Sequence, residues 1–208
     1  MLSRVYTQKS KYEIVGQLLQ GKRGSLLDIG ARDRMLGGYI ERTNIQYFSA
    51  DVDPGHDYQI NIEQHIDIND KVFNYVCALD VLEHVENIHF AFSELARITK
   101  DTLIIALPNV ATLPRRWSFF WKSNLGTAKY ALLPEHQRDR HRWLTIYPEI
   151  NLFIEENARK ANFKLDIVYE QLEWIRLFWR IFPFFARLGV FKGGLMTERC
   201  IYILTRIQ

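Results

Sequence analysis

Hydrophobic positions along the chain follow two different spacings. Short runs of apolar residues bounded by polar turns predict seven strands, at residues 25–29, 45–50, 58–62, 72–79, 102–107, 164–169 and 200–206. Apolar residues three and four positions apart predict helices at residues 8–20, 88–99 and 148–160. Gly37 and Gly38 are expected to break the segment after the first strand, and residues 108–145 are expected to be irregular.

Strands that alternate with helices indicate parallel strands joined by crossover helices. Residues 73–110 show this clearly, because a strand, an amphipathic helix and a second strand follow one another. The run at 102–107 is almost continuously apolar, as expected for a strand that is covered on both faces. We therefore predict an α/β fold, a Rossmann-like doubly wound seven-stranded sheet that is mostly parallel and has helices on both faces.

The composition is that of an ordinary globular protein. Of 208 residues, 48% are hydrophobic and 25% are charged, and no break in composition divides residues 1–208 into two domains. The first residues lack the apolar core of a signal peptide, and no stretch is long and uncharged enough to span a bilayer. Cys77 and Cys200 lie within predicted strands, which favours buried thiols, no metal site and a cytoplasmic location.

Polar residues stand where the predicted strands end. Asp28 and Gly30 end the first strand, Asp51 ends the second and Asp80 ends the fourth. Parallel strands of such a sheet bind ligands at their carboxyl ends, and glycine permits a close backbone approach. Asp51 follows Gly30 at about the 20-residue spacing of a carboxylate that binds ribose hydroxyls.

Two segments resemble the class I S-adenosylmethionine-dependent methyltransferases. They are SLLDIGARDRMLGG at 25–38 and Asp-Val-Leu-Glu-His-Val at 80–85, and the resemblance covers roughly residues 12–170. It implies methyl transfer from S-adenosylmethionine and an antiparallel last strand. The residues that it implies for cofactor binding are Asp28, Gly30, Asp51, Asn61 and Asp80.

The glycine loop departs from the pattern of that family. The family usually has Gly-x-Gly-x-Gly, whereas Arg32 and Arg34 stand here at the second and third glycine positions. A methyltransferase-shaped binding or membrane-docking module without catalysis is therefore an alternative. A nicotinamide-dependent enzyme is a poorer one, because Gly-x-Gly-x-x-Gly is absent.

A basic and aromatic insertion at 110–145 is expected to contact the acceptor. Residues 114–142 hold seven arginines or lysines and two acidic residues. Residues 140–145 are similar to a His-Leu-Arg-Phe-Phe-Thr-like element of the family, with Arg140 in place of its histidine. His141, His136 and Arg142 are the candidates for acceptor contact or proton removal, since imidazole titrates near neutrality and guanidinium binds anions. The alternative is a basic surface loop folded over the cleft.

A second insertion, at 172–191, reads as an amphipathic helix with aromatic and basic faces. Such a helix suits an anionic membrane surface, while packing on the sheet or in a homodimer interface is the alternative. Together the two insertions suggest a small or lipid-linked, glycan-type, anionic acceptor for a peripheral membrane enzyme. A nucleic acid is not favoured as a partner, because the net charge is only +3 and no binding module is recognisable.

Overall fold

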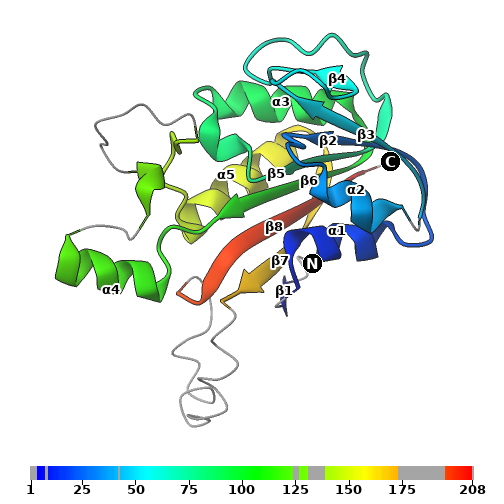
Figure 1. Ribbon diagram of the computed structural model, residues 1–208. Helices are drawn as coiled ribbons and strands as arrows, with labels where there is room; N and C mark the ends of the chain where they lie inside the picture. Colours follow the sequence, from blue (N-terminus) through cyan, green and yellow to red (C-terminus); the bar gives the residue numbers. More distant parts are fainter. Residues whose placement is uncertain are drawn as a thin grey trace.

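The computed structural model describes residues 4–7, 9–41, 43–123, 127–130, 139–172 and 195–207. Its described residues form one eight-stranded sheet with helices on both sides (Figure 1). The elements are, in chain order, β1 (Arg4–Thr7), α1 (Lys11–Leu19), β2 (Arg23–Ile29), α2 (Met35–Ile40), β3 (Asn44–Asp51), β4 (Tyr58–Gln59), β5 (Phe73–Leu79), η1 (Leu82–His84), α3 (Ile88–Ile98), β6 (Thr99–Pro108), α4 (Leu113–Lys122), η2 (Ala128–Tyr130), α5 (Tyr147–Lys160), β7 (Phe163–Gln171) and β8 (Thr197–Arg206).

The strand order is β1-β7-β8-β6-β5-β2-β3-β4. Only β8 runs antiparallel to its neighbours in this sheet of described strands, and it does so against both β6 and β7. The chain moves outward from β2 in one direction to β3 and in the other to β5. The carboxyl ends of β2 and β5 therefore lie at the topological switch point, where such sheets bind ligands.

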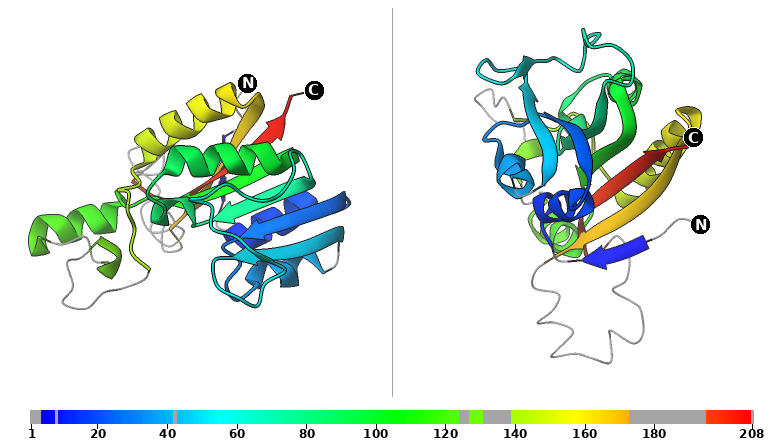
Figure 2. Two further views of the ribbon diagram at one scale, coloured as in Figure 1. Left: turned by 90° about the horizontal axis from the view of Figure 1, so that it is seen from above. Right: turned by 90° about the vertical axis from the view of Figure 1, so that its right-hand side faces the viewer.

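Two separate apolar cores cover the sheet. Helices α3 and α5 pack on one face, with Leu95 and Ile154 fully buried there. Helices α1 and α2 pack on the other face, with Val15 and Leu36 fully buried. Figure 2 shows the two pairs of helices on opposite sides of the strands. A sheet covered on both faces has almost no polar side chains in its central strands, and β5 is accordingly buried along nearly its whole length.

The predicted fold class is confirmed, with one strand added. The antiparallel last strand is β8, and the helices lie on both faces as expected. The predicted number of seven strands was wrong, because the described sheet has eight. The additional strand is β1, which pairs in parallel with β7 at the edge of the sheet. A four-residue edge strand carries too short a pattern to be recognised in the sequence.

Two local predictions were also wrong. Gly37 and Gly38 do not break the chain but lie inside the six-residue helix α2. Residues 108–145 are not wholly irregular, because α4 occupies ten of them. Helix α4 has no buried residue, so it lacks the buried apolar stripe by which a helix is usually recognised.

The amphipathic segment predicted at 172–191 lies almost entirely outside the described residues, which stop at 172 and resume at 195. In the part of the chain that the structure describes, no helix is both long and apolar enough to cross a membrane.

Candidate active site

A cavity of about 630 Å³ opens where β2, β3 and β5 end. Its volume lies within the range of about 300–1,000 Å³ usual for small-molecule sites. Gly30, Asp51, Asn61 and Asp80 line it, so four of the five predicted cofactor residues are brought together. They meet because the carboxyl ends of parallel strands share one edge of the sheet.

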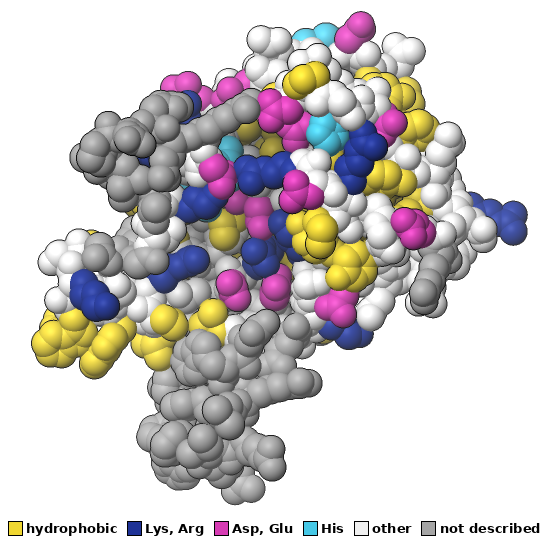
Figure 3. All heavy atoms as spheres, viewed as in Figure 1, with side chains coloured by type: hydrophobic (Ala, Val, Ile, Leu, Met, Phe, Trp, Pro, Cys, Tyr) yellow, Lys and Arg dark blue, Asp and Glu magenta, His cyan; other side chains and the backbone are white. Residues whose placement is uncertain are grey.

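The cavity wall is strongly acidic. Six carboxylates and one guanidinium, that of Arg32, line it among the described residues. The acidic residues are Asp33, Asp51, Asp53, Glu63, Asp80 and Asp139. Figure 3 shows acidic and basic side chains intermingled on this side of the molecule. A wall of this kind favours a ligand with positive charge.

Gly30 lines the cavity at the end of β2. It has a φ of 72°, and a Cβ built on it would lie 2.6 Å from Cγ2 of Val81. Its N–H donates to the carbonyl of Ala50 at 2.8 Å, which holds the end of β2 against β3. Only glycine fits both the backbone conformation and the space.

Asp51 lies at the end of β3 and organises the two loops beside it. Its Oδ2 accepts the backbone N–H of Arg32 at 3.2 Å, and its Oδ1 accepts the backbone N–H of Asp53 at 3.2 Å. The carboxylate is thereby fixed at the cavity wall, although it is only 9% exposed. Asn61, on the loop after β4, also lines the cavity, and its Oδ1 accepts the backbone N–H of Glu63.

Asp28 lies behind the cavity rather than on its wall. It is 4% exposed, and its Oδ2 accepts the phenolic hydroxyl of Tyr47 at 2.8 Å. Burial raises the pKa of Asp28 to about 6, against the opposing effects of Tyr47 and Lys11. The structure therefore shows Asp28 in contact with β3 and does not show it facing the cavity.

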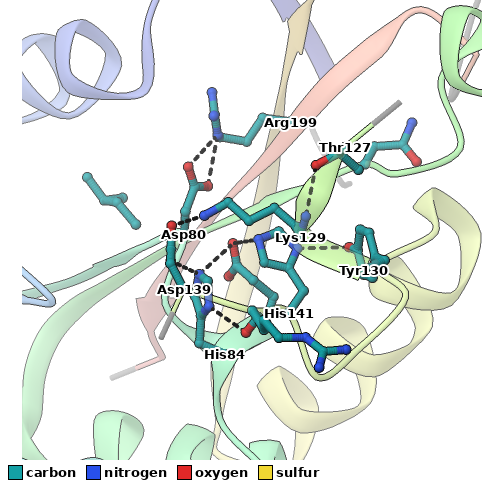
Figure 4. A network of polar contacts seen from close by, with 12 residues as sticks. Asp80, His84, Thr127, Lys129, Tyr130, Asp139, His141 and Arg199 are labelled. Carbon is teal, nitrogen blue, oxygen red and sulfur yellow. Dashed lines mark hydrogen bonds and ion pairs between the residues drawn. The ribbon is translucent and has the colours of Figure 1, made fainter. Parts of the chain in front are cut away.

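Asp80 is held by two cations from distant parts of the chain. Lys11 of α1 donates to its Oδ2 at 2.8 Å, and Nε of Arg199 in β8 donates to its Oδ1 at 2.8 Å. Burial opposes its ionisation, but Arg199 and Lys11 outweigh burial and lower the pKa of Asp80. Its carboxylate is therefore charged at neutral pH, and Figure 4 shows it turned toward Arg199.

Beside Asp80, three side chains converge from η1 and from the segment before α5. Nε2 of His84 lies 4.0 Å from Oε1 of Glu83, and Nε2 of His141 lies 3.9 Å from the same oxygen. The two imidazole rings meet edge to face at 4.7 Å (Figure 4). Burial lowers the pKa of His141 to about 4 and also lowers that of His84, so both rings are neutral at pH 7.

Glu83 is completely buried in this cluster. Burial, together with the negative charge of Asp80, raises its pKa to about 8. Neither of its carboxylate oxygens accepts a hydrogen bond from any residue that the structure describes. An uncompensated buried carboxyl is costly, which makes Glu83 a candidate for a functional role.

Asp139 links the two sides of the cavity. Its Oδ1 pairs with Nη2 of Arg32 at 2.7 Å, and its Oδ2 pairs with Nζ of Lys129. Asp139 and Arg32 both line the cavity, so their ion pair joins the loop after β2 to the segment before α5. Figure 4 shows Lys129 and Asp139 next to the histidine pair.

The three residues predicted to meet the acceptor differ in their placement. His141 belongs to the cluster with Glu83, and its Nδ1 contacts the hydroxyl of Tyr130 at 2.8 Å. Arg142 has an exposed side chain, does not line the cavity, and donates its backbone N–H to the carbonyl of Glu83 at 2.7 Å. His136 lies outside the described residues.

Several residues of the site were not predicted from the sequence. Lys11 and Arg199 lie 69 and 119 residues from Asp80, so no local pattern connects them to it. His56 lines the cavity, and its buried Nδ1 has no partner in the described part of the chain. For Glu83 the sequence did carry a signal, because it lies within the Asp-Val-Leu-Glu-His-Val segment, but its burial could not be inferred.

A family model described as a methyltransferase domain matches residues 6–166. This match covers most of the chain, and the chain therefore belongs to the methyltransferase domain family. Fold, family and cavity together define a class I S-adenosylmethionine-dependent methyltransferase, which confirms the resemblance seen in the sequence. No sequence among the curated proteins matches this chain.

Solved structures share the fold at low sequence identity. A SAM-dependent methyltransferase from Archaeoglobus fulgidus is 16% identical with a TM-score of 0.60, and the alignment covers 96% of each chain. One from Methanosarcina mazei is 12% identical with a TM-score of 0.57, over 93% of this chain and 97% of that one. A Haemonchus contortus phosphoethanolamine N-methyltransferase is 15% identical with a TM-score of 0.59, over 94% of this chain and 52% of that one.

Proposed function

We propose that this enzyme transfers the methyl group of S-adenosylmethionine to a lipid-linked acceptor at an anionic membrane surface. The methyltransferase class rests on the family and the fold, whereas the acceptor and the membrane are inferences from surface chemistry. The observation that carries these inferences is the exposure of the aromatic side chains of α4. The cofactor and the acceptor are considered in turn below.

The described cavity suits S-adenosylmethionine in charge and in volume. The cofactor carries a sulfonium and an ammonium, and six carboxylates line the wall. Asp51 would accept the ribose hydroxyls, while Gly30 permits the close backbone approach and Asp80 lies near enough to the switch point to meet the methionine end. The Haemonchus contortus neighbour was solved with S-adenosylhomocysteine, which agrees with this assignment.

The protein's part in the reaction is mainly alignment. The bound cofactor supplies an electrophilic methyl group, and an acceptor must approach it in line with the bond to sulfur. Neutral His141 and His84, beside the cavity, supply imidazole nitrogens that can contact an acceptor hydroxyl. Arg32 and Asp139 narrow the cavity on the same side, because their ion pair joins two of its loops.

Helix α4 carries an aromatic surface that no described residue covers. Trp117, Phe119, Phe120 and Trp121 are 58–74% exposed. Trp117 and Trp121 stack edge to face at 5.6 Å, so the aromatic stripe runs along the helix. Figure 1 shows α4 at one end of the molecule, and Figure 3 shows hydrophobic side chains gathered there. Aromatic residues on an exposed helix suit the interface of a bilayer.

The charges of α4 favour an anionic surface. Arg115, Arg116 and Lys122 belong to the helix, which contains no acidic residue. The acidic cavity would repel a negatively charged acceptor, so the attraction for anions lies on α4 rather than in the cavity. A lipid anchor reconciles these features, because it holds the acceptor at the membrane while its methylated group enters the cavity.

Two variants separate cofactor binding from membrane binding. Trp117→Glu/Trp121→Glu should lower partition into anionic phosphatidylglycerol vesicles at least about tenfold, since burying one such side chain stabilises by about 1.5–3 kcal/mol. The same variant should bind S-adenosylhomocysteine as the wild type does. Asp51→Ala should show the reverse, with weakened S-adenosylhomocysteine binding in calorimetry and unchanged vesicle partition.

Leu152→Glu is the matched control, because Leu152 is 68% exposed on α5 rather than on α4. It should retain both kinds of binding. If the tryptophan variant and Leu152→Glu sediment equally with vesicles, α4 is not the membrane surface. If the wild type fails to bind S-adenosylhomocysteine, the cofactor site itself is wrong.

A further inference from the structure

Glu83, His84 and His141 have the arrangement of an incomplete coordination sphere. One donor atom from each lies within 4.8 Å of the other two. The two distances from Glu83 Oε1 to the imidazole nitrogens, 3.9 and 4.0 Å, are too long for hydrogen bonds. The three groups converge without bonding to one another.

The buried carboxyl group of Glu83 is what points to a ligand. Its side chain is 0% exposed, and both oxygens lack a hydrogen-bond partner among the described residues. Native proteins rarely leave a buried carboxyl group in this condition, because its desolvation then has no compensation. A cation placed between the carboxylate and the imidazoles would provide that compensation.

The far side of each imidazole is already fixed as a metal ligand requires. Nδ1 of His84 lies 2.9 Å from the carbonyl oxygen of Arg140, which can only accept, so this nitrogen carries the proton. The lone pair of His84 therefore lies on Nε2, facing Glu83. Nδ1 of His141 contacts the hydroxyl of Tyr130 at 2.8 Å and can be held in the same tautomer. Partners of this kind orient histidine ligands in metal sites.

From this geometry we propose that Glu83, His84 and His141 bind a divalent first-row transition-metal ion. Ligands at about 2.0–2.2 Å from one tetrahedral ion lie about 3.4 Å apart. The two distances from Glu83 therefore need to close by about half an ångström, while the donor atoms of the two histidines, which lie within 4.8 Å of each other, need to close by up to about 1.4 Å. Two imidazoles and one carboxylate favour ions such as Zn²⁺, Co²⁺ or Mn²⁺ over Ca²⁺, which prefers oxygen ligands alone.

The surroundings are compatible with a bound cation. Oδ1 of Asp139 lies 3.4 Å from Nε2 of His84, which makes Asp139 a candidate for an additional ligand. Asp80 adds negative charge on the same side, although Lys11 and Arg199 pair with it. Lys129 lies next to the histidine pair, and its ammonium is engaged by Asp139.

The proposed ion lies at the wall of the cavity, because His84 and Asp139 belong to the cavity lining. Its remaining coordination positions can hold an oxygen of the methyl acceptor, so that with the ion bound the two imidazoles act on the acceptor through the ion rather than by direct contact. This role rests on the proposed methyl transfer, whereas the binding of the ion does not. The ion would also explain how an acidic cavity holds an acceptor that carries no positive charge of its own.

Co²⁺ titration of the purified, metal-free chain tests the proposal through visible absorption bands that arise when Co²⁺ is bound by protein ligands. The wild type should bind one Co²⁺ per chain, and Zn²⁺ should displace it. Glu83→Gln and His141→Gln should each weaken binding at least about a hundredfold, and Tyr130→Phe should weaken it roughly tenfold or more, since loss of a partner of a ligand costs 10–100-fold.

His65→Gln is the matched control. Nδ1 of His65 lies 3.0 Å from the buried Glu94, so this pair repeats the histidine and glutamate chemistry outside the cavity. The control should bind Co²⁺ as the wild type does. The proposal is overturned if the folded wild type binds no Co²⁺, or if the Glu83 and His141 variants bind it as tightly as His65→Gln. Calorimetry with S-adenosylhomocysteine on the same samples shows separately whether the cofactor site is intact.

Discussion

Arg32, Arg34 and Asp80 hold left-handed backbone conformations around the cavity, with φ values of 41°, 55° and 62°. A residue with a Cβ is strained there by about 1–2 kcal/mol. Arg32 and Arg34 stand at the second and third glycine positions of the pattern that the sequence resembles, and both hold a backbone conformation that glycine favours. That backbone still directs the N–H of Arg32 to Asp51, and the arginine side chains do not fill the cavity.

Gly30 is the position in this loop where an added methyl group has no room. Gly30→Ala should destabilise the protein by about 2 kcal/mol, because the positive φ and the contact with Val81 both oppose a Cβ. In the double variant Gly30→Ala/Val81→Ala, the loss of stability caused by the contact with Val81 should disappear, while the loss caused by the positive φ should remain. Urea unfolding of the single and double variants measures the two contributions.

Gly38→Ala is the control for this prediction. Gly38 lies in α2 with nothing within 4 Å of its added Cβ, so the substitution should raise stability by about 0.5–1 kcal/mol. A Gly30→Ala protein as stable as Gly38→Ala would mean that the loop moves away from Val81 without cost.

At the scale of elements, α3 fixes the loop that forms one wall of the cavity. Arg97 donates to the carbonyls of Ile66 and Ile68 and to Asp70 and Glu94. Glu94 in turn accepts the backbone N–H of Ile66 at 2.8 Å. Arg97 and Glu94 together therefore hold the segment after β4 against α3. This segment carries Asn61 and Glu63 to the cavity.

The pairing of Arg97 with Glu94 predicts that the stability of the protein depends on pH. Hydrogen bonds from Arg97 lower the pKa of Glu94 to about 2, below the value of about 4.5 expected in the unfolded chain. The contribution is therefore fully present above about pH 4.5 and is lost as the pH falls toward 2. Glu94→Gln should cost about 1–2 kcal/mol at pH 7 and progressively less in acid, as urea unfolding across this range would show.

Glu156→Gln serves as the comparison for Glu94→Gln. Glu156 pairs with Arg159 three residues away on the exposed side of α5, where solvent screens the interaction. The free energy of unfolding of this variant should equal that of the wild type at every pH. If the free energy of unfolding depends on pH in the same way in the two variants, Glu94 and Arg97 do not stabilise the protein as proposed.

The sequence predicted the long buried strands because their apolar runs are continuous, as in β5 and β6. It missed β1, a short edge strand, and α4, whose aromatic side chains face away from the described core. It also placed Asp51 and Asp80 at the cavity, since both positions follow from where strands end. The partners of Asp28 and Asp80 could not be predicted, because Tyr47, Lys11 and Arg199 reach them only through tertiary packing.

At the scale of the whole molecule, Arg199 connects three strands. It belongs to β8, and it binds Asp80 beyond the end of β5 and Glu170 of β7, the latter at 2.6 Å. Its guanidinium compensates two largely buried carboxylates at the edge of the sheet that bears the cavity. The pairing of β8 with its neighbours and the charge balance of the site therefore depend on each other.

Removal of Arg199 should be costly for this reason. Arg199→Ala leaves Asp80 with Lys11 alone and Glu170 without its guanidinium partner, so we expect a loss of about 2–4 kcal/mol in the free energy of unfolding. Lys164→Ala is the control, because it removes an exposed contact with Asp166 at 3.8 Å. Thermal unfolding of both variants tests the difference, and equal melting temperatures would refute it.

Because β8 lies in the middle of the sheet but comes last in the chain, the sheet can be completed only at the end of synthesis. This strand is the last of the eight to leave the ribosome, yet it separates β6 from β7 in the finished sheet. Until it inserts, both neighbours expose bare hydrogen-bonding edges, which are the surfaces that chaperones cover and that aggregate when left open. A nascent polypeptide interrupted before this strand would also lack Arg199, and Asp80 would then lack one of the two cations that hold it at the cavity.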